Sequence, residues 1–189
     1  DDLDTKENQN RFFAGIPNIP KNKPETMAIY LLFIQHIFYS LSKKGMAAIV
    51  IPTGFNKAQG GISLKIKEYI IKNKILRGVI IMPPNIFATT GTNVSILFID
   101  KNNKDEKIIL IDASKLGKAV KEGKNKKIVL SGEEDQYIID TFNQNKEIED
   151  FSCLVTHNEI ENKRFNFNAG TYFKIKIKYT DITNEEFEN

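Results

Sequence analysis

Cysteine and histidine are scarce in this 189-residue sequence, and their scarcity excludes several kinds of protein. The single cysteine, Cys153, has no partner for an internal disulfide, which favours a reducing, intracellular compartment. His36 and His157 lie far apart, and no cysteine–histidine spacing typical of a zinc site is present. The sequence therefore predicts neither a disulfide-stabilised secreted domain nor a metalloprotein.

Long apolar runs and catalytic signatures are also lacking. The apolar stretch 27–41 is interrupted by Gln35 and His36 and is too short to cross a bilayer, so it predicts a buried helix with His36 inside. The first residues are acidic and polar, unlike a signal peptide. No serine–histidine–aspartate arrangement or phosphate-cradling glycine loop is present, and Gly60-Gly61 alone is more typical of a turn. Pattern alone therefore assigns no chemistry.

The composition is that of a globular domain, with 41% hydrophobic and 27% charged residues and a net charge of +3. The charge is unevenly spread. Residues 101–127 hold nine lysines and four acids, whereas residues 132–161 hold nine acids and one lysine. One interpretation is that both runs are solvated faces of the domain. The alternative concerns the basic run alone, which would form an edge that follows a phosphate backbone.

Hydrophobic periodicity predicts an α/β sheet over the first two thirds of the chain. Residues 1–25 are polar, contain three prolines and predict an open loop with no packed element. A helix over 27–42, capped by Thr26, precedes a strand over 46–52 that we expect to be buried on both faces. An amphipathic helix over 62–73 follows, and its inward stripe is Ile62, Ile66, Tyr69 and Ile70. Strands are predicted at 76–82, 94–100 and 107–112, and the short link between the first two favours an antiparallel hairpin.

The remaining residues predict shorter elements. Asp112 and Ser114 are expected to cap a short helix containing Leu116, and residues 126–130 are expected to be extended. Two capping boxes, Ser131 with Glu134 and Thr156 with Glu159, predict the starts of two further helices. Apolar and polar residues alternate over 164–168 and 172–179.

Six segments, in order from about residue 11 to 173, resemble the modification subunits of type I restriction–modification systems, a family of adenine-N6 DNA methyltransferases. They are Arg11-Phe12 with Gly15-Ile16-Pro17; Phe33-Ile34-Gln35-His36-Ile37 with Ala47-Ala48-Ile49-Val50-Ile51-Pro52; Gly60-Gly61 with Ile66, Tyr69-Ile70 and Asn73; Asn85-Ile86-Phe87 with Thr90-Gly91-Thr92; Ile111-Asp112-Ala113-Ser114; and Glu159-Ile160 with Phe165-Asn166-Phe167-Asn168. No single segment decides the resemblance, but six in register are specific.

The resemblance implies an α/β fold, the C-terminal half of a doubly wound S-adenosylmethionine-dependent methyltransferase sheet with an antiparallel hairpin strand and a small C-terminal α/β extension. It divides the chain into a loop continuing from a missing N-terminal half (1–25), a partial methyltransferase domain (26–112) and a C-terminal extension (113–189). The family's glycine-rich cofactor loop and its "NPPF/Y" tetrapeptide are not found, and Pro83-Pro84-Asn85 has the wrong order. We therefore expect no catalytic residue in this chain, and the tetrapeptide shortly before Asp1.

Two aromatic residues match binding positions of the family. Phe33 matches the residue that packs against the adenine of the cofactor, and its alternative is a core phenylalanine. Phe87 matches the residue that stacks on the flipped target adenine, and its alternative is a loop residue folded back on the sheet. A large apolar side chain between a proline turn and a threonine–glycine turn suits stacking on an extruded base.

The resemblance thus implies a fragment of a subunit that, when complete, transfers a methyl group from S-adenosylmethionine to adenine in DNA. Its implied partners are DNA, a specificity subunit that reads the target and a restriction subunit, in the bacterial cytoplasm. The chain alone is expected to be inactive and to self-associate. Two alternatives stay open: a catalytically inactive module that docks on DNA or on a specificity subunit, and half of a small-molecule or RNA methyltransferase.

Overall fold

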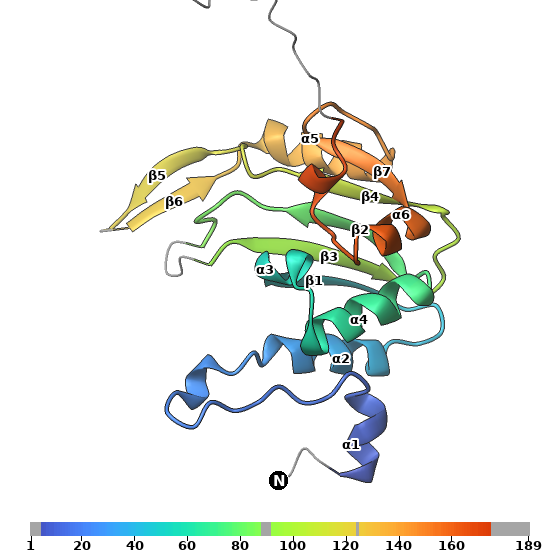
Figure 1. Ribbon diagram of the computed structural model, residues 1–189. Coiled ribbons are helices and arrows are strands. Elements are labelled where there is room, and N and C mark those ends of the chain that lie inside the picture. Colours follow the sequence, from blue (N-terminus) through green and yellow to red (C-terminus); the bar gives the residue numbers. More distant parts are fainter. Residues whose placement is uncertain (1–4, 88–91, 124, 175–189) are drawn as a thin grey trace, which may run out of the picture.

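A five-stranded mixed sheet forms the centre of the computed structural model, which describes residues 5–87, 92–123 and 125–174 (Figure 1). A separate two-stranded sheet projects from it. The helices are α1 (Lys6–Arg11), α2 (Tyr30–Ser40), α3 (Gly54–Lys57), α4 (Gly61–Lys72), α5 (Gly132–Asn143) and α6 (His157–Asn162), with 3-10 turns η1 (Pro24–Thr26) and η2 (Ala169–Thr171). The strands are β1 (Met46–Pro52), β2 (Leu76–Ile81), β3 (Val94–Asp100), β4 (Lys107–Asp112), β5 (Lys118–Glu122), β6 (Asn125–Val129) and β7 (Ser152–Thr156).

The strand order of the main sheet is β1-β3-β2-β4-β7. β3 is antiparallel to both β1 and β2, so these two run in the same direction, and β2 and β4 form a parallel pair. The predicted hairpin between β2 and β3 is confirmed by the pairing of Val79 with Leu97. β1, β2 and β4 therefore end at the same edge of the sheet, which we call the carboxyl edge.

Two helices, α2 and α4, cover one face of the sheet (Figure 1). The predicted inward stripe of α4 is confirmed, because Ile66 and Ile70 are fully buried and Ile62 and Tyr69 pack against the same core. Alternate residues of the strands point into this core, among them Ile49, Ile51, Val79, Leu97, Ile108 and Leu110.

Helix α5 lies on the opposite face, over β2 and β4 (Figure 1). The ring of Phe142 lies 4.4 Å from that of Phe98, measured between centroids. A Cβ atom at Gly78 would lie 2.7 Å from a Phe142 ring carbon and 2.7 Å from the carbonyl oxygen of Ile109. Glycine at this position therefore lets α5 approach the sheet closely.

The expectation that β1 is buried on both faces was wrong. Its burial alternates: Ile49 and Ile51 are buried, whereas Met46 and Val50 are 73% and 54% exposed. In the described part of the chain β1 is an edge strand paired only with β3, and α5 does not extend over it. One face of an otherwise apolar strand is therefore left uncovered.

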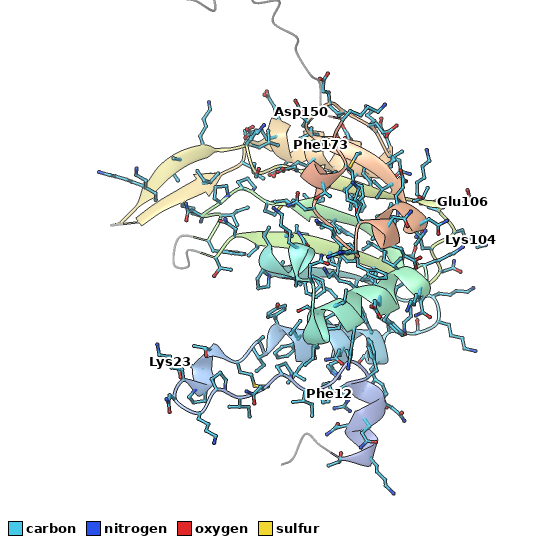
Figure 2. All side chains as sticks on the ribbon, in the orientation of Figure 1. Phe12, Lys23, Lys104, Glu106, Asp150 and Phe173 are labelled. Carbon is cyan, nitrogen blue, oxygen red and sulfur yellow. The ribbon has the colours of Figure 1, made fainter. Side chains whose placement is uncertain are left out.

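The expectation of an open loop over residues 1–25 was also wrong. Residues 6–11 form α1, and Phe12 and Ala14 are buried beside α2 (Figure 2). The Gln35 side chain causes this packing: its Oε1 accepts from Ala14 N at 2.8 Å, and its Nε2 donates to Gly15 O at 3.0 Å. A buried amide thus satisfies backbone groups of the polar segment, which hydrophobic periodicity does not detect.

Helix α2 differs from its prediction at its start and in its orientation. It begins at Tyr30, because the Thr26 hydroxyl donates to Lys23 O within η1 rather than capping the helix. His36 is exposed instead of buried, and the neighbouring Gln35 takes the buried position. The helix is therefore amphipathic, with Phe33 and Tyr39 on its exposed side.

The C-terminal third contains one wrong prediction and two confirmed ones. No helix follows β4, because Asp112 Oδ1 accepts from Ser114 N at 3.0 Å and closes a turn that leads into β5. Both predicted capping boxes are present and open α5 and α6. Residues 164–168 alternate without forming a strand, and the predicted alternation over 172–179 extends beyond the described residues. Strand β7 pairs with β4 in the main sheet, and the division of the chain at residue 112 stays a prediction.

We expect the isolated 189-residue chain to self-associate through β1. The outer edge of this strand is unpaired within the described residues, and it exposes Met46 and Val50. Light scattering should detect dimers or larger species at high concentration, with binding of a hydrophobic dye. The Val50→Lys substitution places a charge on that edge and should shift the protein towards monomer. A monomeric parent chain without dye binding would contradict this expectation.

Candidate functional site

The candidate site lies at the carboxyl edge, where loops follow β1, β2 and β4. Open α/β sheets bind ligands in the crevice outside the carboxyl ends of their strands, at the point where the strand order reverses. The loop after β1 contains Thr53, α3 and Ala58, and the loop after β2 contains Phe87. Strand β3 begins at the same edge with Val94 and Ser95, so it brings a third segment to the site.

A buried polar cluster connects the β1 loop to β3. The hydroxyl oxygens of Thr53 and Ser95 lie 3.0 Å apart, and Asn56 Nδ2 donates to Ser95 Oγ at 2.9 Å. Asn56 and Ser95 are fully buried, and Asn56 Oδ1 has no hydrogen-bond partner among the described residues. Unpaired buried acceptors are costly and are therefore rare in folded proteins.

Lys67 of α4 is fully buried and holds the β1 loop in place. Its Nζ donates to Asn56 O at 3.3 Å and to Ala58 O at 2.5 Å, and it lies 5.6 Å from the centre of the Phe167 ring. The same Asn56 carbonyl also accepts from Phe167 N at 3.0 Å. Burial lowers the pKa of Lys67 to about 8. The ammonium group thus joins α4, the β1 loop and the C-terminal segment.

Sequence reasoning missed Lys67, although a signal was present. The residue precedes the buried Ile70 by three positions and Ile71 by four, so helical spacing places all three on the same face. A lysine on an apolar face is expected to be paired or to bond backbone carbonyls. The same argument would have identified Gln35.

Phe87, the predicted base-stacking residue, is 47% exposed at the carboxyl end of β2. Its loop is fixed at two points: Pro83-Pro84 ends the strand, and Asn85 O accepts from Ile128 N of β6 at 3.0 Å. Asn85 adopts a left-handed conformation with φ of 54°. The matched Thr90 and Gly91 lie outside the described residues. The exposed ring at a held loop is available to a ligand.

Phe33, the predicted cofactor residue, is 59% exposed on α2 and is not a core phenylalanine in this chain. It lies near the start of the helix, and the helix ends at the turn that precedes the amino end of β1. The start of α2 is therefore directed towards the carboxyl edge. No aromatic contact joins Phe33 to Phe87 in the described part of the chain, so the two rings do not stack on each other.

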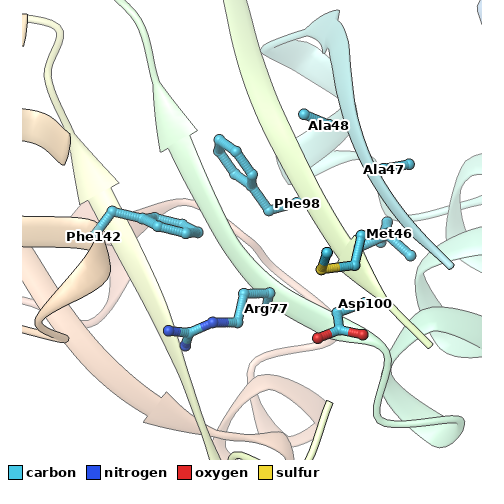
Figure 3. Close-up of a pocket in the computed structure, with 8 residues that line it drawn as sticks. Met46, Ala47, Ala48, Arg77, Phe98, Asp100 and Phe142 are labelled. Carbon is cyan, nitrogen blue, oxygen red and sulfur yellow. The ribbon is translucent and has the colours of Figure 1, made fainter. Parts of the chain in front are cut away.

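A hollow of about 320 Å³ lies at the opposite end of the sheet (Figure 3). It is lined by Met46, Ala47, Ala48, Arg77, Phe98, Ile99, Asp100 and Phe142. Arg77 there is already paired, with Asp105 at 2.8 Å and with Asn145 Oδ1 at 3.1 Å. The hollow therefore does not belong to the candidate site.

Comparison with known proteins identifies the family. The N-6 DNA Methylase family matches residues 2–180 of the sequence. The chain belongs to this family. The chain is similar to the methylase subunit of the type I restriction enzyme MpnII from Mycoplasma pneumoniae. The two are 34% identical over 153 residues, 80% of this chain and 27% of that protein. The methylase subunit of MjaIX from Methanocaldococcus jannaschii is 28% identical over 158 residues, 78% of this chain and 28% of that protein. The chain thus spans about a quarter of the length of these relatives.

The fold of this chain is similar to the crystal structure of the type I restriction-modification system methyltransferase subunit from Streptococcus thermophilus. The TM-score is 0.68 at 21% identity, over 83% of this chain and 35% of that one. The predicted fold class, part of a methyltransferase sheet with an inserted antiparallel strand, is thereby confirmed. Within the described residues, no cluster of histidine, cysteine and acidic side chains suits a metal ion, and no helix has the length and apolar character to span a membrane.

Stability should rise with pH because of Lys67. Its native pKa is about 8 and its ordinary value is 10.5, so between these values the unfolded chain binds more protons than the folded chain. Burial of the charge therefore costs stability below pH 8, and the cost disappears as pH rises to 10.5. We expect the free energy of unfolding to gain at most about 3 kcal/mol from this group.

Denaturant unfolding at several pH values between 7.5 and 10.5 tests this, with Lys67→Met as the comparison. The methionine variant has no titrating group at the position and should lack the increase. Equal slopes for the two proteins would show that Lys67 does not titrate in this window.

Proposed function

We propose that this chain is part of a type I modification subunit that transfers a methyl group from S-adenosylmethionine to N6 of adenine in DNA. The family match over residues 2–180 carries the proposal. The carboxyl edge supports it, since it combines an exposed aromatic ring at Phe87 with a buried polar cluster around Ser95. A catalytically inactive docking module would need neither feature.

In this proposal, Phe87 stacks on the target adenine after it has left the duplex. A base outside the duplex loses the stacking of its neighbours, and an aromatic ring restores about 1–3 kcal/mol of it. The ring must be held in place for this to help, and the prolines and the Asn85–Ile128 hydrogen bond hold its loop. Phe87 is therefore a binding residue that raises the population of the extruded base.

The cofactor supplies the electrophilic methyl group when bound. The exposed ring of Phe33 fits one flat face of the cofactor's adenine, and its neighbours Leu32 and Ile34 are buried and fix the orientation of the helix. The polar cluster of Thr53, Asn56 and Ser95 lies at the carboxyl edge, where β1 ends and β3 begins. In our proposal it holds the β1 loop in position beside the space shared by cofactor and base.

We infer the partners from the same family assignment. Its named relatives are methylase subunits of type I restriction enzymes, so the complete protein acts on DNA together with a specificity subunit and a restriction subunit. The proposed setting is the bacterial cytoplasm. The proposed division of the chain is a methyltransferase part at 26–112 and an extension at 113–189.

The isolated chain should not methylate DNA and should bind S-adenosylmethionine weakly or not at all. The reason is that the family's glycine-rich cofactor loop is not in this sequence. Calorimetric titration of the 189-residue chain measures this directly. A dissociation constant in the low micromolar range would mean that the cofactor site lies mainly within these residues.

In the complete subunit, Phe87→Ala should slow methyl transfer by about five- to a hundred-fold, which corresponds to the loss of one stacking contact. Cofactor affinity should hardly change, because Phe87 is proposed to contact the base and its ring does not touch that of Phe33. A fluorescent adenine analogue at the target position reports extrusion, and single-turnover methylation reports chemistry.

Phe33→Ala is the matched control, since it also removes an exposed ring. It should weaken cofactor binding and leave extrusion unchanged. If the Phe87 variant extrudes and methylates like the parent protein, Phe87 is only a packing residue and the site assignment is wrong.

A further inference from the structure

The hairpin of β5 and β6 projects from the main sheet on the side of the carboxyl edge (Figure 1). Its base is fixed at two points. Gly117 N donates to Glu134 Oε1 at 2.8 Å, and Ile128 N donates to Asn85 O at 3.0 Å. The second bond joins the hairpin to the loop that carries Phe87, so both have a fixed relative position.

The hairpin is strongly basic. Residues 115–129 contain six lysines and one acid. Glu134 at the base interacts with Lys118, but Lys121 and Lys126 lie further out, are exposed and have no carboxylate within ion-pair distance among the described side chains. The arm therefore has a net positive charge, and its two outer lysines are exposed to solvent.

The two outer lysines face each other. Lys121 and Lys126 are direct partners in the antiparallel register, so their side chains extend from the same face of the hairpin. Like charges in this position destabilise a two-stranded sheet, which is marginally stable in water by itself. An anionic ligand that lies across both ammonium groups would remove the repulsion.

The shape of the arm suits duplex DNA. A two-stranded ribbon matches the width of the major groove, about 12 Å, and five residues per strand extend about 16 Å. Val120 and Val129 are 42% and 44% exposed and give the ribbon apolar contact area beside its lysines. The Asn85–Ile128 hydrogen bond joins the hairpin to the Phe87 loop. A duplex whose extruded base reaches Phe87 therefore passes within reach of the arm.

We propose that the β5–β6 hairpin is a DNA-contacting arm in which Lys121 and Lys126 bind phosphates next to the extruded base. The inference rests on the proposed function in that DNA is the substrate. It adds a surface outside the methyl-transfer site, and this surface affects how the duplex is held rather than how the methyl group moves.

The test compares Lys121→Gln/Lys126→Gln with Lys43→Gln/Lys44→Gln in the complete subunit assembled with its specificity subunit. Lys43 and Lys44 are exposed in the turn before β1, at the opposite end of the sheet, so the control removes the same charge. Fluorescence anisotropy with a duplex of about 30 base pairs, at several salt concentrations, gives the slope of log affinity against log salt.

The hairpin variant should lower the magnitude of this slope by about 2, since each phosphate contact contributes about 0.9. Its affinity near 0.1 M salt should fall by about ten- to a hundred-fold. The control variant should keep the parent slope. Lys121→Arg/Lys126→Arg retains the charge and should bind like the parent, and unchanged cofactor affinity shows that each variant is folded.

An unchanged slope in the hairpin variant would overturn the inference, and so would equal losses in the hairpin and control variants. Loss of a partner subunit with an unchanged DNA slope would also overturn it and identify a protein-docking arm. Adenine methylation by the parent protein, measured separately, distinguishes the two proposals. If the parent methylates adenine but the hairpin variant keeps the parent salt slope, only the DNA-contacting arm is rejected. If the hairpin variant has a lower slope but the parent does not methylate adenine, only the proposed function is rejected. Absence of DNA binding by the parent protein rejects both.

Discussion

The insertion of β3 between β1 and β2 is the constraint on which the candidate site depends. Because β3 is antiparallel to both neighbours, it begins at the carboxyl edge, where β2 ends, and places Ser95 beside the loop that follows β1. A parallel arrangement would have required a crossover to the opposite edge of the sheet, usually through a helix. The antiparallel arrangement keeps both ends of the connection at the carboxyl edge, and that connection holds Phe87. Sheet topology thus brings the β1 loop, the start of β3 and the Phe87 loop to one edge.

The buried polar groups determine how that edge is held. Lys67 bonds two carbonyls of the β1 loop, and Asn56 bonds Ser95, so the loop is fixed to α4 and to β3 at once. Burying an ammonium group without a carboxylate costs free energy, as its lowered pKa indicates. A methionine could fill the same volume without that cost, but Ala58 O would lose the donor that Lys67 supplies and Asn56 O would keep only Phe167 N. The presence of Lys67 is therefore better explained by its role in holding the β1 loop in position than by a contribution to the stability of the fold.

Periodicity predicted the elements that bury a simple apolar stripe and failed where polar atoms decide the structure. The stripe of α4, the β2–β3 hairpin and both capping boxes were predicted because spacing alone specifies them. The burial of Gln35 and Lys67 was not predicted, since each depends on backbone groups distant in sequence. The uncovered face of β1 was not predicted either, because an apolar strand has the same sequence whether or not a helix covers it. Phe33 and Phe87 came from family resemblance, and the structure adds their exposure.

Both ends of the sheet contain unpaired polar atoms, but exposed and conflicting side chains accompany them at the carboxyl edge. At the amino ends of the parallel strands, Arg77 binds Asp105 and Asn145, and Lys101 donates to two carbonyls at the end of α2. The buried His157 Nε2 at the start of α6 has no hydrogen-bond partner among the described residues. At the carboxyl edge, Asn56 Oδ1 has no partner among the described residues, the Phe87 ring is exposed, and Lys121 faces Lys126. Local conflicts of this kind are expected to gather where a protein binds something, because selection for stability alone would remove them. The combination of an unpaired amide oxygen, an exposed ring and two facing lysines therefore favours the same edge as the sheet topology.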